Sequence, residues 1–169
     1  LEFRRVLFRS DTSGNTNLTI TGTGTISFIS ASAKTFNSGG LSLPNVTINQ
    51  GGAGTLTVSN SNTFKDITAT YIATGATAIA FTAGITQTVS AFSAAGASAK
   101  LLTLNSATAG LQATIALSSG GTVSTNYLSV QDIAFTPGPA ANGSTPYVWY
   151  LGANSTNSGN NVVTRLGGR

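Results

Sequence analysis

The side chains that most often carry out chemistry in proteins are imidazoles, thiols and paired carboxylates, and this sequence has few of them. Its 169 residues include no histidine and no cysteine, and only four are acidic. Nucleophilic triads need a base such as histidine, and glycoside hydrolysis needs two carboxyl groups within about 10 Å of each other. We expect Asp66, in a strand, and Asp132, at a strand end, to cap polar groups or to be exposed. We therefore predict that the chain is not an enzyme and holds no catalytic residue, cofactor or metal.

The aromatic segment PYVWY, Pro146 to Tyr150, is the strongest candidate for a binding site. Strand-like alternation would place Tyr147 and Trp149 on one side of the backbone. Exposed together, these two rings would form a platform for sugar rings. The alternative, which we favour, is that Trp149 packs over the apolar core at the end of the fold as a cap. The residues predicted for glycan contact or for the terminal cap are Tyr147, Trp149 and Tyr150.

The formal net charge of +4 is concentrated at the two ends of the chain. Three arginines lie in the first ten residues and two in the last five, whereas the body from Asp11 to Thr164 is neutral. The lysines of this body occur singly, so no basic stripe is present along which a phosphate backbone would lie. We predict that the chain neither binds nucleic acid nor spans a membrane.

The first ten residues, LEFRRVLFRS, differ in composition from everything that follows them. They are charged and bulky, without threonine or glycine, and LFRS resembles the conceptual translation of a common sequencing adaptor. A short basic amphipathic tail is the alternative. Neither is a secretory signal, which needs an apolar core of about 7 to 15 residues. We leave residues 1–10 out of the fold as an artefactual tail and expect the true chain to extend upstream.

Beyond residue 10, aliphatic residues alternate with threonine and serine, as in strands that bury one face. Short strands of this kind recur every twenty-odd residues, and glycine-rich corners such as Gly51-Gly52 and Gly120-Gly121 separate them. No stretch between them favours a helix. Because one such unit cannot bury its apolar side alone, the recurrence predicts a stacked β-solenoid. The repeated strands are VTI (Val46 to Ile48), ITA (Ile67 to Ala69), VSA (Val89 to Ala91) and LSV (Leu128 to Val130).

The best internal match predicts how successive coils pair. At a spacing of 21 residues it aligns Leu43 with Phe64, Asn45 with Asp66, Val46 with Ile67 and Thr47 with Thr68. A further step of 22 places Val89 beneath Ile67. This spacing predicts three short strands per coil, parallel pairing between coils, inward columns of aliphatic residues and phenylalanine, and outward threonine and serine ladders.

An antiparallel β-sandwich is the competing fold, because short strands with glycine turns also occur there. Hairpins of a sandwich would be expected to carry Asn-Gly or Asp-Gly turns. The sequence has none between Leu41 and Asp132, which favours the solenoid.

Five segments follow one another between residues 62 and 161, namely TFKDITA, AIAFTAGITQTVSAFSAAG, KLLTLNSATAG, TVSTNYLSVQD and VWYLGANSTNSGNN. In this order they resemble the closing coils of pectin-lyase-like right-handed β-helices, which occur in large bacterial surface proteins and phage structural proteins. The resemblance covers Asn62 to Asn161 and implies a right-handed parallel coil. After its Asn-Asn pair the chain departs from that pattern, ending in VVTRLGGR.

Together these features predict an all-β, right-handed parallel β-helix, truncated at its N-terminus. Residues 11–136 would form the coils, and residues 137–169 a terminal loop, aromatic cap and polar tail. With only 7% charged residues and no cysteine, the composition suits an extracellular surface. The expected function is a non-catalytic structural or adhesion module of a secreted, cell-surface or virion protein, with a surface glycan or a neighbouring chain as partner and exposed coil ends that permit oligomers. The alternative is a polysaccharide-binding or polysaccharide-degrading β-helix whose catalytic coils lie upstream.

Overall fold

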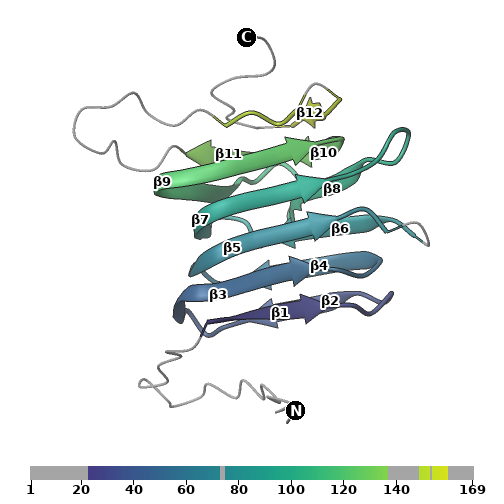
Figure 1. The fold of residues 1–169 in the computed structure, drawn as a ribbon. Helices are drawn as coiled ribbons and strands as arrows, with labels where there is room; N and C mark the ends of the chain where they lie inside the picture. The colour runs from purple at the N-terminus through teal and green to yellow at the C-terminus, as the bar shows by residue number, and fades with distance from the viewer. Residues whose placement is uncertain (1–22, 73–74, 137–148, 153, 160–169) are drawn as a thin grey trace.

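The computed structural model describes residues 23–72, 75–136, 149–152 and 154–159. These residues form a parallel β-solenoid of about five turns, with no helix among them. Its coils stack in chain order, from β1 and β2 at one end to β12 at the other (Figure 1). The structure therefore confirms the predicted all-β parallel solenoid and excludes the sandwich, whose strands would pair antiparallel.

The coils share two six-stranded parallel sheets, and each turn of the chain contributes one strand to each sheet. Sheet A contains β1 (Gly24–Phe28), β3 (Ser42–Gln50), β5 (Asn62–Thr70), β7 (Thr86–Ala95), β9 (Ala113–Asn126) and β11 (Ile133–Thr136). Sheet B contains β2 (Lys34–Asn37), β4 (Gly54–Ser59), β6 (Thr77–Phe81), β8 (Leu102–Ser106), β10 (Leu128–Gln131) and β12 (Thr156–Ser158).

The predicted three strands per coil are wrong, because each coil contributes one strand to each of two sheets, and one strand of sheet A runs through a position where a corner was expected. β9 continues through Gly120-Gly121 as a single strand of 14 residues. It accommodates the glycines as a bulge: Val89 pairs with Leu117, but Ala91 pairs with Thr122. The LSV strand also differs from expectation, since it lies in sheet B as β10, whereas the other three repeated strands lie in sheet A.

The predicted register between β3 and β5 is right at its start and wrong beyond it. Leu43 pairs with Phe64, as the repeat predicts. A register shift in β3 then brings Thr47, and not Asn45, opposite Asp66. In the same way, Ile67 pairs with Ile48 in place of Val46, and Thr68 pairs with Asn49 in place of Thr47. Extra residues in one strand of a pair are what define a β-bulge, and an ungapped repeat cannot reveal them.

The spacing between coils is also less regular than the sequence predicts. Val89 pairs with Phe64 and not with Ile67, so the step from β5 to β7 is 25 residues. In sheet B the step lengthens from 22 residues between β2 and β4 to 27 between β10 and β12. Paired strands must keep their register, whereas the corners between them tolerate insertions.

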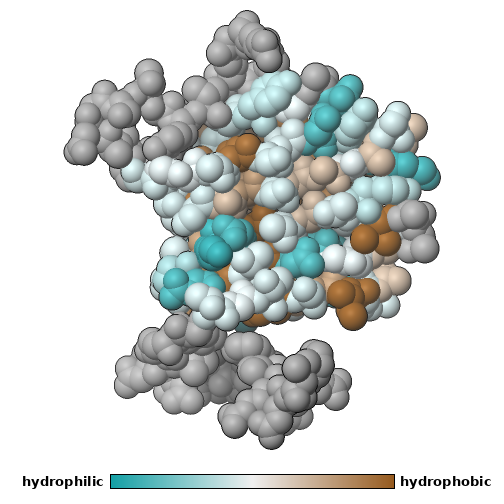
Figure 2. All heavy atoms as spheres, in the orientation of Figure 1, coloured by the Kyte–Doolittle hydropathy of each residue, from teal (hydrophilic) through white to brown (hydrophobic). Residues whose placement is uncertain are grey.

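Inward columns of apolar side chains from the two sheets meet in one core. Full burial of one such aliphatic side chain contributes about 1.5–3 kcal/mol. On the outside, mainly weakly polar residues form the face seen in Figure 2, with small, separated apolar areas. Apolar inward columns are therefore confirmed. Fully buried members of the two central columns are Ile48, Ile67 and Phe92 of sheet A, and Leu56, Ile79 and Leu104 of sheet B.

Candidate binding surface

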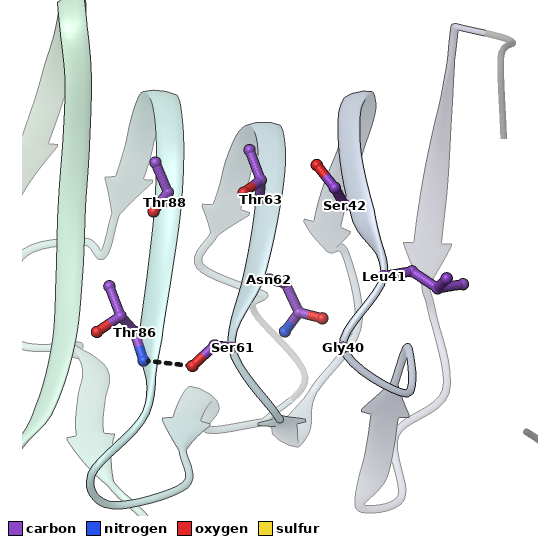
Figure 3. Close-up of a pocket in the computed structure, with 8 residues that line it drawn as sticks. All are labelled: Gly40, Leu41, Ser42, Ser61, Asn62, Thr63, Thr86 and Thr88. Carbon is purple, nitrogen blue, oxygen red and sulfur yellow. Dashed lines mark hydrogen bonds between the residues drawn. The ribbon is translucent and has the colours of Figure 1, made fainter. Parts of the chain in front are cut away.

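A shallow groove crosses three coils where the chain turns from sheet B into sheet A. Its volume is about 170 Å³. No charged side chain lines it, so the groove presents mainly hydroxyl groups and backbone to a ligand. Its lining residues are Gly40, Leu41, Ser42, Ser61, Asn62, Thr63, Thr86 and Thr88 (Figure 3).

One wall of the groove is a row of hydroxyl side chains from successive coils. Ser42, Thr63 and Thr88 occupy the same register position in β3, β5 and β7 and stand in a row (Figure 3). Neighbouring strands lie about 4.8 Å apart, so the row repeats at that spacing. Within the described part of the chain, none of the three hydroxyls has a hydrogen-bond partner. They are therefore available to donate to and accept from a bound molecule.

A buried chain of amide side chains lies beneath this wall. The Ser38 hydroxyl donates to Oδ1 of Asn62, whose side chain is 4% exposed. Nδ2 of Asn62 donates to Oε1 of Gln87 at 2.7 Å, and Nε2 of Gln87 donates to the Asn60 carbonyl at 2.7 Å. Because an unpaired buried amide is costly, this chain ties three neighbouring corners to one another and fixes the shape of the groove.

The corner backbone of the groove is held in a similar way. The amide of Thr86 donates to Oγ of Ser61 at 3.1 Å, which links the starts of β5 and β7 (Figure 3). Gly40 precedes the groove wall with a φ of +85°, a conformation that glycine adopts without strain. This turn brings the half-buried Leu41 to the edge of the groove.

The predicted aromatic site is not part of the groove. The Trp149 side chain is fully buried, with ring centroids 4.6 Å from Phe135 and 5.6 Å from Phe92. Its Nε1 donates to the Thr136 carbonyl at 3.1 Å. Trp149 therefore has no face open to a sugar ring, and the prediction that it is exposed as part of a sugar-binding platform is wrong for this residue. Tyr150 is 46% exposed.

Tyr147 and most of the two predicted terminal segments, residues 1–10 and 137–169, lie outside the described residues. Among the described residues no helix has the length and apolar character that a membrane crossing needs.

The two aspartates beyond the first coil belong to different coils and have separate local roles. On β5, Oδ2 of Asp66 accepts a hydrogen bond from Oγ1 of Thr47 at 3.2 Å. Asp132 is 1% exposed, and its Oδ2 accepts from the Gly110 amide at 2.9 Å, which holds the corner before β9. In the described ranges no three acidic, histidine or cysteine side chains gather where a metal ion would bind.

The amino-acid pattern predicts the outward hydroxyl ladder but not the groove. The alignment of Leu43 with Phe64 already places Ser42 beside Thr63, so the repeat contains the signal for the hydroxyl row. The concavity depends on the corner at Gly40 and on the buried amide chain, and both depend on contacts between coils.

Comparison of the chain with protein-family models, with curated proteins and with solved structures found no match.

Proposed function

We propose that this chain is a non-catalytic structural or adhesion module of a secreted, cell-surface or virion protein. The observation that carries the proposal is the in-register outer columns of small polar residues. One column runs through all the long strands of sheet A, with hydrogen bonds from Asn49 to Ser27 at 3.3 Å and from Thr68 to Asn49 at 3.0 Å. Continuous ladders along two parallel sheets make a stiff rod, and its polar columns present the same groups at each coil.

The adhesive contact of this proposal is the groove, and its ligand is a neutral glycan. Uncharged hydroxyls recur along its wall at about the separation of neighbouring strands. A saccharide chain also presents hydroxyls at regular intervals, and it forms hydrogen bonds with such a wall without burying a charge. The absence of basic residues from the lining favours a neutral sugar over an acidic one.

Binding of neutral polysaccharides to the full chain tests this contact. Replacing Thr63 and Thr88 together by valine removes two hydroxyls and keeps the β-branched shape that suits a strand. Each lost hydrogen bond is worth about 1 kcal/mol, so we expect roughly a tenfold or larger loss of affinity. The matched control is Thr103→Val on sheet B, whose ladder does not border the groove. Equal affinity of the groove variant and wild type, measured by calorimetry or on a glycan array, would contradict the adhesive role and leave the structural one.

The finer assignment is to the pectin-lyase-like right-handed β-helices of bacterial surface or phage structural proteins. It is supported by the parallel stacking and by the general rule that parallel strand crossovers wind to the right in about 98% of cases. The alternative function, a polysaccharide-degrading β-helix with catalytic coils upstream, makes use of the same groove. Release of reducing ends from a polysaccharide by a longer chain containing those coils, but not by these 169 residues, would favour it.

A further inference from the structure

The hydroxyl row that forms one wall of the groove is interrupted at β9. Ser42, Thr63 and Thr88 are in register, and the next position of their column, in β9, is Ala116. Ala116 is partly exposed, has no polar group in its side chain, and does not line the groove. From Ser42 onward the wall therefore presents hydroxyl groups on three successive strands of sheet A and then a gap.

A second row of hydroxyls beside the first continues past this gap. Ser61 and Thr86 stand two residues before Thr63 and Thr88, on the same outward side of their strands, and both line the groove. Thr114 of β9 pairs with Thr86 and so continues the second row, yet Thr114 does not line the groove. The groove thus ends at the strand whose first-row residue is alanine, although a hydroxyl of the second row is present there.

Only one direction across the groove repeats the same chemistry. Two residues further along the three strands, the exposed side chains are Pro44, Lys65 and Ser90, which differ from strand to strand. The Lys65 ammonium also lies 3.9 Å from the Asp66 carboxylate, which brings charge to that side. A neutral chain that lies along the solenoid axis instead meets one hydroxyl at each strand, about every 4.8 Å.

We propose, on the basis of the glycan contact proposed above, that the groove binds its glycan along the solenoid axis, with one sugar unit at each of three strands, and that Ala116 sets this length. An extended chain of equatorially linked pyranose rings advances by close to one strand spacing per unit, so its hydroxyls stay near one row over three strands. A groove of about 170 Å³ does not enclose three rings. Each unit therefore lies with one edge on the wall and the other in water.

Oligosaccharide length and one substitution at the gap test the proposal. The probes are linear β-1,4-linked oligomers of glucose, mannose or xylose, two to five units long, titrated into the full chain by calorimetry. Wild-type affinity should rise up to three units and then level off. Ala116→Thr places a hydroxyl in the gap, so it should bind the four-unit oligomer about fivefold more tightly than the three-unit one, the gain expected from one hydrogen bond. Ala116→Val is the matched control, because it has the same branched shape without the hydroxyl, and its affinity should level off at three units.

The possible failures are distinguishable from one another. If no oligomer binds wild type, or if the variant with valine at both Thr63 and Thr88 binds as tightly as wild type, the glycan contact itself is wrong and the proposal fails with it. If oligomers bind through these threonines but affinity levels off before three units or keeps rising beyond them, the contact stands and the three-unit arrangement is wrong. Equal affinities of Ala116→Thr and Ala116→Val for the four-unit oligomer would show that Ala116 does not set the length. The wild-type series remains decisive if Ala116→Thr fails to fold.

Discussion

The two ends of the described solenoid finish the same core in different ways. At the β11 end, Trp149 is fully buried against Phe135. At the β1 end, Phe36 of β2 remains partly exposed, although its ring centroid lies 5.7 Å from that of Phe64 in β5. Each coil of a solenoid is stabilised by the neighbours on both of its sides. A large aromatic side chain is therefore expected to contribute more where it is fully buried than where it remains partly exposed.

The largest effect should come from removing the buried indole. Trp149→Ala would leave a cavity beside Phe92 and Phe135 and remove the hydrogen bond to Thr136. We expect the free energy of unfolding in urea to fall by about 3–5 kcal/mol. Tyr150→Ala is the control, because the Tyr150 side chain is 46% exposed. Its truncation should lower the free energy of unfolding by less than about 1 kcal/mol. Similar losses for both variants would show that the indole does not close the core.

The buried amide chain should give the next largest effect. Asn62→Ala removes the amide that donates to Oε1 of Gln87 and the oxygen that accepts from the Ser38 hydroxyl, although Ser38 still accepts from the Gly40 and Leu41 amides. Unsatisfied buried polar groups cost about 1–3 kcal/mol, so we expect a loss of that size in chemical denaturation. Asn49→Ala, in the outer column, removes an amide that solvent can replace. A loss as large for Asn49→Ala as for Asn62→Ala would mean that burial of the amide chain does not matter.

The β1 end of the described solenoid should tolerate loss of an aromatic ring better than the β11 end. Phe36→Ala removes a ring that is only partly buried, so its expected cost is about 1–2 kcal/mol. Thermal and urea unfolding of Phe36→Ala and Trp149→Ala under identical conditions give the comparison. A loss for Phe36 equal to or greater than that for Trp149 would reverse our interpretation of the two ends.

The parts of the fold that sequence predicted are those that repeat locally. Alternation of apolar and polar residues predicted the strands, and the match of Leu43 with Phe64 predicted their parallel stacking. Glycine pairs were less informative, because the same flexible backbone serves a corner or a bulge. Gly120, with a φ of +76°, lies in the bulge of β9 and does not end the strand.

The candidate surfaces depended more on contacts between coils than on pattern. The position of Ser42 and Thr63 on the outside follows from alternation, but the groove between them also needs the corner that precedes β3. The burial of Trp149 is a property of its neighbours in β7 and β11 and not of the PYVWY segment.

Substitution in the outer polar ladder should change the free energy of unfolding least, less than substitution at either end of the core. Thr68→Val removes the hydrogen bond that Oγ1 of Thr68 donates to Oδ1 of Asn49 and keeps the β-branched shape. Because water can satisfy Asn49 and valine favours strands, we expect the free energy of unfolding to change by less than about 0.5 kcal/mol. Urea denaturation measures this change. A loss above about 1 kcal/mol would show that the outer hydroxyls stabilise the stack themselves. A negligible change would separate the two roles of the molecule, with the apolar columns supplying stability and the polar ladders remaining free for contact with a partner.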